Sequence, residues 1–182
     1  PSSPYAASKA AGDLLINSYV KTYGLPALIA RSANNYGPFQ YPEKVIPLFV
    51  TNLIEGKKVP LYSKGENVRD WLFVEDNVRG LWAIFQKGKV GEIYNVGAGF
   101  EHTNLTLTHA LLKITGKDES WIRRVKDRPG HDYRYSVNFS KARALGYCPR
   151  VTFQEGLKKT VVWYSENSAW WKPLKNNSFT RK

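Results

Sequence analysis

The sequence has 182 residues, with 27 lysines and arginines against 15 aspartates and glutamates, for a formal net charge of +12. This length allows one domain with a hydrophobic core, and the basic balance predicts an anionic partner: a nucleic acid, a membrane surface or a phosphorylated small molecule. The one cysteine, Cys148, excludes an internal disulfide, and the three histidines have no metal-ligand spacing, so no metal is expected.

No signal peptide and no run of about 20 apolar residues is found, so we expect a cytoplasmic protein that does not enter a membrane. The sequence begins at Pro1 and contains no methionine. We therefore expect it to be part of a longer protein.

Hydrophobic periodicity predicts helices and strands that alternate along the chain. In chain order, we expect a helix at 5–23, a strand at 27–31, a loop at 32–38, a helix at 45–54 and a strand at 58–62. A strand at 71–74, a helix at 75–85, a strand at 93–97, a helix at 105–114, a strand at 121–125 and a helix at 153–164 follow. The residues after Pro173 look disordered. Alternation of this kind predicts an α/β fold.

Tyr5 and Lys9 lie four residues apart in the first predicted helix, one turn apart on the same face. This geometry suits a phenol whose pKa is lowered by the nearby ammonium, so that it can act as a base near neutral pH, while the lysine can also hydrogen-bond a cofactor hydroxyl. Both residue types are common, so the pair alone is a weak signal.

Further motifs strengthen the signal. Together with Tyr5–Lys9, residues 31–38 (Arg-Ser-Ala-Asn-Asn-Tyr-Gly-Pro) resemble the extended short-chain dehydrogenases/reductases that act on nucleotide sugars. Residues 41–47, 69–76 and 127–132 narrow the resemblance to the dTDP-glucose 4,6-dehydratase family. The resemblance extends from Pro1 to about Tyr164. Nucleotide-sugar epimerases and decarboxylases share the first two motifs but match the last three poorly.

The resemblance implies an α/β chain that is the C-terminal part of a Rossmann-like parallel-sheet domain plus a smaller α/β substrate-binding lobe. We expect 1–38 and 70–100 to belong to the NAD-binding domain, 39–69 and 101–172 to the nucleotide-sugar lobe, and 173–182 to be a disordered tail.

A nucleotide sugar presents a pyrophosphate, a flat base and several hydroxyls to its binding site. Arginine provides fork-shaped donors for phosphate, lysine a point charge, asparagine neutral donors and tyrosine a flat surface for the base. The resemblance places nine residues in the substrate site: Asn34, Lys44, Val45, Pro60, Tyr62, Arg69, Asn104, Arg128 and His131. It also implies that Tyr5 and Lys9 are catalytic and that Tyr5, Lys9 and Asn35 contact the cofactor.

Each assignment has a structural alternative. Arg69 could pair with Asp70 or Glu66 on the surface, and Asn34 and Asn35 could simply form a turn. Arg128 could decorate a turn, and Tyr62 could pack in a strand. We assign Trp71, Trp82, Trp121 and Trp163 to packing rather than to a base-binding surface.

The glycine-rich fingerprint of dinucleotide-binding folds does not occur in the sequence, since Gly97-Ala98-Gly99 lacks the third glycine. The family's threonine before the tyrosine, and its adjacent Asp–Glu pair, would precede Pro1. We therefore expect the C-terminal part of an NAD-dependent nucleotide-sugar 4,6-dehydratase that is inactive alone and forms a homodimer when full length.

Two alternatives stay open: an epimerase or decarboxylase on the same scaffold, and a basic nucleic-acid-binding module. Against the second, the basic residues are spread along the chain and no nucleic-acid motif occurs. We therefore expect a nucleotide-sugar substrate and neither a nucleic-acid nor a membrane partner.

Overall fold

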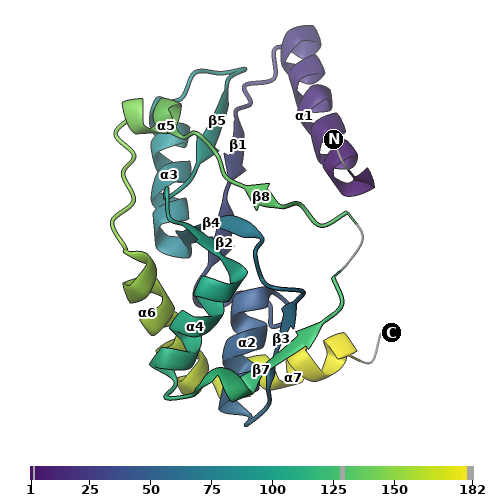
Figure 1. The fold of residues 1–182 in the computed structure, drawn as a ribbon. Coiled ribbons are helices and arrows are strands. Elements are labelled where there is room, and N and C mark those ends of the chain that lie inside the picture. Colours follow the sequence, from purple (N-terminus) through teal and green to yellow (C-terminus); the bar gives the residue numbers. More distant parts are fainter. Residues whose placement is uncertain (2, 128–129, 180–182) are drawn as a thin grey trace.

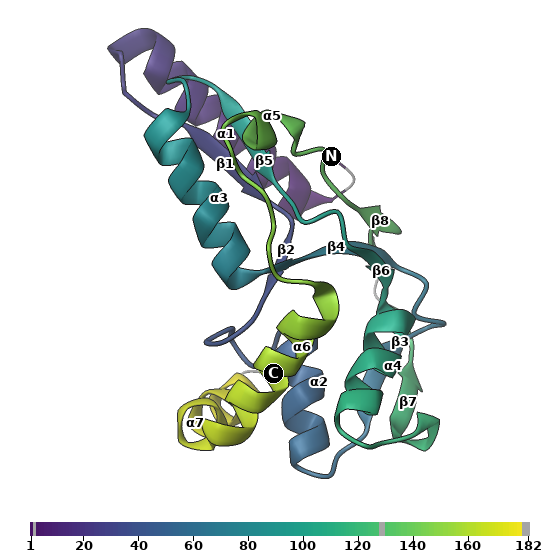
Figure 2. The ribbon, with the colours of Figure 1, turned by 90° about the vertical axis from the view of Figure 1, so that its left-hand side faces the viewer.

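The chain forms two halves stacked along one long axis, with a small sheet between them (Figures 1 and 2). The computed structural model describes residues 1, 3–127 and 130–179. Arg128, which the sequence places in the substrate site, lies outside this part of the chain.

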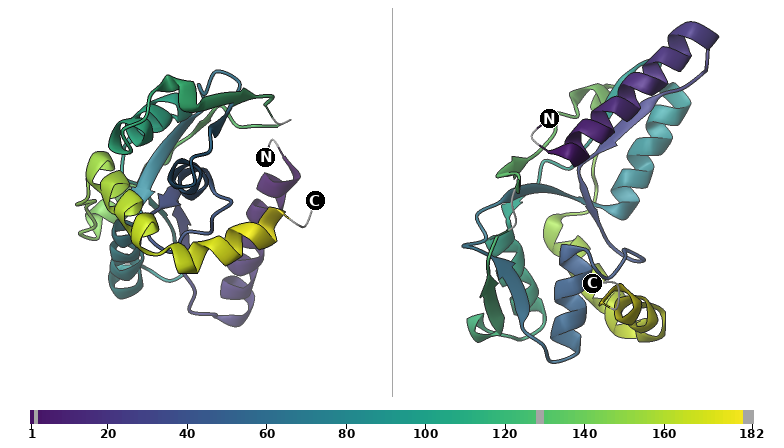
Figure 3. Two further views of the ribbon diagram at one scale, coloured as in Figure 1. Left: turned by 90° about the horizontal axis from the view of Figure 1, so that it is seen from below. Right: turned by 90° about the vertical axis from the view of Figure 1, so that its right-hand side faces the viewer.

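The first half is built on two parallel strands, β1 (Ile29–Ser32) and β5 (Ile93–Val96), which pair from Ile29–Ile93 to Ser32–Val96. Helices α1 (Pro4–Tyr23) and α3 (Val74–Lys87) lie on either side of this pair, as Figure 3 shows, and α5 (Ser140–Ala144) packs beside β5. The structure confirms the helices predicted at 5–23 and 75–85.

The middle sheet is centred on β4 (Val68–Phe73), which pairs in parallel with β2 (Asn34–Tyr36) and β8 (Arg134–Tyr135) and antiparallel with β6 (Glu101–Thr103). The prediction of a loop at 32–38 is therefore wrong for its central residues. Their asparagines are typical of turns, but pairing with a distant strand and burial of Tyr36 at 1% exposure outweigh that local preference.

The second half consists of four helices and a two-stranded parallel ribbon at its edge (Figure 2). The ribbon strands are β3 (Val59–Tyr62) and β7 (Ile122–Val125), and a short 3-10 turn (Glu119–Trp121) precedes β7. The helices are α2 (Val45–Ile54), α4 (Asn104–Ile114), α6 (Phe153–Glu166) and α7 (Ser168–Phe179).

Helix boundaries follow their capping residues. The Ser3 hydroxyl accepts from the Ala6 backbone N–H at 3.1 Å where α1 begins, and Gly24 ends the helix in the left-handed region at φ 66°. Thr152 and Glu155 form a reciprocal capping box at the start of α6.

Two hydrophobic cores meet at β4. Trp71 and Phe73 belong to the core of the second half, whereas Leu72 belongs to the core of the first half. Successive side chains of a strand point to opposite faces, so a single strand supplies both cores. The packing role predicted for Trp71 agrees with its 3% exposure, but Trp82 is 57% exposed and stacks on Phe85.

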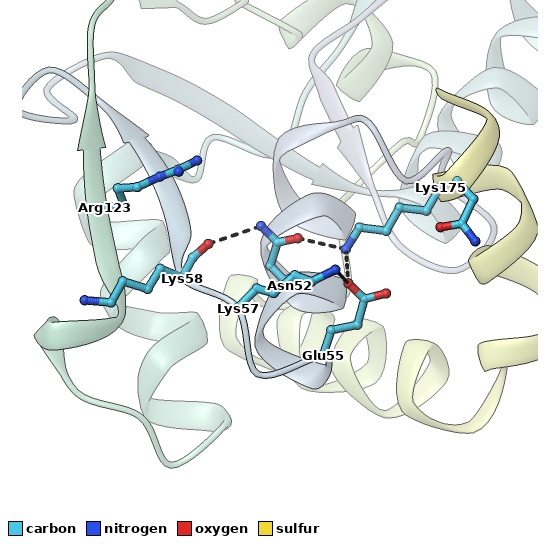
Figure 4. A pocket seen from close by; sticks show the side chains of 7 residues that line it. Asn52, Glu55, Lys57, Lys58, Arg123 and Lys175 are labelled. Carbon is cyan, nitrogen blue, oxygen red and sulfur yellow. Dashed lines mark hydrogen bonds and ion pairs between the residues drawn. The ribbon is translucent and has the colours of Figure 1, made fainter. Parts of the chain in front are cut away.

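The end of the chain differs from the disorder expected after Pro173, because α7 continues to Phe179. The ammonium of Lys175 is buried and donates to Asn52 Oδ1 at 2.8 Å and Glu55 Oε2 at 3.0 Å (Figure 4). It also donates to Thr51 Oγ1 at 2.9 Å. Burial lowers the pKa of Lys175, and the Glu55 carboxylate opposes that effect. Composition indicated a polar tail and did not reveal this long-range contact.

Within the described residues, no helix is long and apolar enough to cross a membrane. In the same part of the chain, no cluster of three or more histidine, cysteine, aspartate or glutamate side chains is arranged to hold a metal ion.

Trp171 fixes α7 to α6, since its indole is fully buried and donates to the Tyr164 carbonyl at 2.7 Å. We predict that Trp171→Ala lowers the free energy of unfolding by about 3–5 kcal/mol, because it leaves a large cavity. The control is Trp82→Ala, which removes an exposed ring and is expected to cost less than about 1 kcal/mol. Urea denaturation followed by circular dichroism measures both, and equal losses would contradict the docking of α7.

Candidate functional site

A cleft of about 510 Å³ lies between the two halves. It is formed by the N-terminal ends of α1 and α2, strands β2 and β4, the end of β3 and the start of α4. Its lining includes ten of the predicted site residues: Tyr5, Asn34, Asn35, Lys44, Val45, Pro60, Tyr62, Arg69, Asn104 and His131.

An adjoining hollow of about 700 Å³ shares Tyr5, Asn34, Asn35 and Arg69 with the cleft and extends over Ser3, Ser32 and Tyr135. The fold thus brings together residues more than 120 positions apart in the sequence. Their functional roles stay predictions. Among the predicted residues that the structure describes, Lys9 alone lines neither hollow.

Tyr5 and Lys9 lie on one face of α1, as their spacing predicts. The Lys9 ammonium is 5.9 Å from the centre of the Tyr5 ring, and the ring is 72% exposed at the mouth of the cleft. The hydrogen bond from Arg31 Nε to Asp13 Oδ2 at 2.6 Å links α1 to β1.

Arg69 is buried rather than on the surface, with 8% exposure. Its guanidinium donates to the carbonyl oxygens of Asp132 at 2.8 Å and Val68 at 2.7 Å. Its neighbour Asp70 points to the opposite face of β4 and accepts from the Ala98 and Phe100 backbone N–H groups at 3.2 and 3.0 Å. The surface pairing of Arg69 with Asp70 is therefore excluded, and the guanidinium faces the cleft.

Burial raises the pKa of the Asp70 carboxyl, although backbone N–H groups from the 98–100 turn oppose that effect. This carboxyl is enclosed by its own turn and belongs to the framework that holds β4. It does not line the cleft.

The N-terminal end of α2 opens into the cleft at Lys44 and Val45. Lys44 caps the helix without a side-chain hydrogen bond, and its ammonium lies 3.0 Å from the Glu43 carboxylate. A helix N-terminus carries a partial positive charge and free N–H groups, so together with Lys44 it suits a phosphate.

Two rings form another part of the wall. The Tyr62 and His131 rings are 6.0 Å apart in an edge-to-face arrangement, and Tyr62 is 42% exposed. The His131 side chain is 7% exposed, and its Nδ1 lies 2.8 Å from Asp127 Oδ1. This contact holds the imidazole in place and leaves the exposed Tyr62 face free for a flat group.

Four buried polar atoms of residues that line the cleft have no hydrogen-bond partner in the described part of the chain: Asn34 Oδ1, Asn35 Oδ1, Gln40 Oε1 and Trp71 Nε1. A buried donor or acceptor that is left unsatisfied costs about 1–3 kcal/mol. Such atoms gathered along one cleft indicate a surface that a polar ligand completes.

Sequence reasoning missed Gln40 and the polar role of Trp71. The Trp71 ring packs edge-on against Tyr36 as predicted, but its Nε1 is one of the four unpartnered atoms. Nothing in the run around Gln40 marks it, because glutamine is common in surface loops. Only the fold places it beside Asn35.

Comparison with known proteins shows which family the chain resembles in sequence. A sequence model of the family described as GDP-mannose 4,6 dehydratase matches residues 1–160. The chain is 51% identical over 177 residues to a dTDP-glucose 4,6-dehydratase of Streptomyces niveus, with 97% of this chain and 53% of the relative covered. It is 46% identical over 187 residues to dTDP-glucose 4,6-dehydratase 1 of Escherichia coli K12, with 98% and 52% covered. The chain thus spans about half the length of these curated relatives.

Solved structures give the same result. A dTDP-glucose 4,6-dehydratase from Streptomyces venezuelae, crystallised with NAD bound, matches with a TM-score of 0.92 and 54% identity, covering 96% of this chain and 54% of that one. A UDP-glucose 4-epimerase from Thermotoga maritima matches with a TM-score of 0.85 and 32% identity, covering 91% and 54%. The α/β fold is therefore Rossmann-like, and the chain belongs to the GDP-mannose 4,6 dehydratase family.

Proposed function

We propose that this chain supplies the substrate side of an NAD-dependent dTDP-glucose 4,6-dehydratase, which forms a 4-keto-6-deoxy sugar nucleotide. The observation that carries the proposal is the single cleft in which Tyr5, two cationic side chains and four unpartnered polar atoms meet. The higher identity to the dehydratases, 54% against 32% for the epimerase, favours dehydration over epimerisation.

The cleft has a place for each part of a nucleotide sugar. Lys44, Arg69 and the start of α2 would neutralise the pyrophosphate, because all three are positive and line the same wall. Tyr62 would hold the base on its exposed face. The sugar would then lie beside Asn34 and Tyr5. Arg128, which lies outside the described residues, remains a proposed phosphate contact on sequence grounds.

The residues present fit the nicotinamide end of NAD. Asn35 Oδ1 is a buried acceptor without a partner, and it lines the same hollow as Tyr5. An amide or ribose hydroxyl of the cofactor would supply the missing donor, and Lys9 on the same face of α1 would contact the ribose. When bound, NAD provides the chemistry of accepting and returning a hydride.

Tyr5 is the proposed base of the redox step. Its phenolate oxygen would take the proton of the C4 hydroxyl as that carbon is oxidised, and Lys9 would stabilise this phenolate through its nearby positive charge. The sugar must therefore lie with C4 toward α1. Asn34 and Arg69, which line both hollows, would hold it in that orientation.

We further propose a homodimer formed through α1. None of the 20 residues of this helix is buried, and Leu15, Ile16 and Tyr19, which share one side of the helix, are 59%, 37% and 48% exposed. Exposed apolar groups gathered on one helix are typical of a surface that another chain covers. A twofold interface would place each of these side chains against the same helix of a second copy.

The first test is Tyr5→Phe in the full translation product of the gene, assayed on dTDP-glucose with NAD. We expect turnover to fall about 10²- to 10⁴-fold with little change in substrate affinity, because the hydroxyl is needed chiefly in the transition state. Tyr23→Phe, on the same helix and 75% exposed, is the matched control. Near-normal turnover of Tyr5→Phe would rule out the catalytic role, and an inverted rather than a 4-keto-6-deoxy product would assign an epimerase.

The second test concerns phosphate binding. Arg69→Ala should weaken dTDP binding by about 2–5 kcal/mol, because the bound phosphate would lose its buried cationic partner. The control, Arg143→Ala, removes an exposed guanidinium that stacks on Phe139 at 4.9 Å and should change binding by less than about 1 kcal/mol. Calorimetry measures the affinity of the wild type and of both variants for dTDP, and circular dichroism checks that the variants fold. Equal affinities of the wild type and Arg69→Ala would mean that Arg69 does not contact the phosphates.

The third test concerns assembly. Tyr19→Glu and Ile16→Glu should each shift the full translation product from dimer toward monomer, because the twofold axis places every new charge twice in an apolar contact. The control is Lys21→Glu, which also changes the charge of α1 but lies on the other side of the helix from Tyr19, away from the proposed contact. Sedimentation velocity over a range of concentrations would detect the shift, and a dimer that persists in both variants would mean that α1 is not the interface.

A further inference from the structure

Gln40 lies in the loop between β2 and α2, and it lines both the cleft and the adjoining hollow together with Tyr5 and Asn35. Its Oε1 is buried and has no hydrogen-bond partner in the described part of the chain. No motif in the sequence marks this residue, and no group of the ligand has yet been assigned to it.

The side-chain amide of Gln40 has a fixed orientation. Its Nε2 donates to the Asn35 carbonyl oxygen at 2.7 Å. Rotating the amide by half a turn would place Oε1 against that carbonyl, and two acceptors would then face each other. The amide therefore keeps its carbonyl oxygen as the available group, and Oε1 can only accept a hydrogen bond.

The backbone around Gln40 is also held in place by contacts with the second half. The Gln40 carbonyl accepts a hydrogen bond from the hydroxyl of Tyr164, whose side chain is fully buried in the second core. Phe39, the preceding residue, adopts φ 62°, a left-handed conformation that is strained for a residue with a Cβ. Its ring is 67% exposed and contacts Trp163 and Trp170 on one side, with centroids 4.6 and 5.5 Å away.

A strained backbone that is held by packing beside a cleft is typical of a position where a ligand group is located accurately. The ligand group that meets Gln40 must be a donor. Phosphate oxygens at neutral pH only accept hydrogen bonds, so the phosphates would avoid this point and remain beside Lys44 and Arg69. A hydroxyl group of the hexose is the donor that a nucleotide sugar can bring next to Tyr5.

We propose that Gln40 is a specificity-determining residue: its Oε1 accepts a hydrogen bond from one hydroxyl of the bound hexose and so fixes the sugar ring relative to Tyr5. This inference rests on the proposed function and deepens it. It predicts that the contribution of Gln40 to binding appears only when the ligand carries the hexose.

The test measures binding to the full translation product by calorimetry, so it does not depend on turnover. Gln40→Met keeps the length of the side chain and removes both polar atoms. We expect it to weaken binding of dTDP-glucose roughly 5- to 150-fold, the cost of one unpaired hydroxyl, and to leave dTDP binding unchanged. Gln86→Met, at an exposed position on α3, is the matched control and should change neither affinity.

A series of dTDP-hexoses, each lacking one hydroxyl, then identifies the group that binds. One member of the series should lack the hydroxyl that Gln40 binds. The wild type should bind this analogue more weakly than dTDP-glucose, by the same factor by which Gln40→Met weakens binding of dTDP-glucose. The Gln40→Met variant should bind this analogue and dTDP-glucose with equal affinity. The assignment would be overturned if, for every analogue, the loss of affinity from the substitution multiplied the loss from the missing hydroxyl. It would also be overturned if Gln40→Met weakened binding of dTDP as much as binding of dTDP-glucose. If the wild type binds neither dTDP nor dTDP-glucose, the proposed function fails as well, and so the two failures are distinguishable.

Discussion

The alternation of side chains along β4 is the constraint on which the rest of the structure depends. Leu72 enters the core of the first half, whereas Trp71 and Phe73 enter the core of the second half, so one strand fixes the two halves relative to each other. Arg69 lies on the same face of the strand as Trp71 and reaches the cleft between the halves. A shift of one residue in the pairing of β2 with β4 would exchange these faces and would bury the guanidinium in an apolar core.

Buried carboxylates hold the loops around this strand. Asp70 accepts from the Ala98 and Phe100 N–H groups, and Asp76 accepts from the Arg150 and Val151 N–H groups at 2.8 and 2.9 Å. Both carboxylates have 0% exposure, so their partners satisfy groups that would otherwise be costly to bury. In the part of the chain that the structure describes, the framework thus pairs its buried polar atoms, while the cleft leaves four of them unpaired. This contrast separates a binding surface from a structural one.

Hydrophobic spacing predicted most of the helices and strands because their stabilising contacts follow local periodicity. It failed where distant contacts decide: β2 forms through pairing with β4, and α7 continues past Pro173 because Lys175 and Trp171 are buried against other helices. The candidate site was predicted from motifs that resemble a family, and the fold brought those motifs to one cleft. Gln40 could not be found in this way, since its importance arises from the Asn35 and Tyr164 contacts that only the fold creates.

The cleft holds cationic side chains and unpartnered neutral acceptors on different residues, and in the proposed complex this distribution would orient the ligand. Lys44 and Arg69 would favour groups that only accept, which are the phosphate oxygens of a nucleotide. Gln40 Oε1 would favour a group that donates, such as a sugar hydroxyl, whereas Asn35 Oδ1 would face the cofactor. A nucleotide sugar that entered in reverse would place phosphate oxygens against carbonyl oxygens and hydroxyls against cations, so both ends would lose energy. In the proposed complex, selectivity for orientation would therefore come from repulsion in the wrong pose as much as from attraction in the right one.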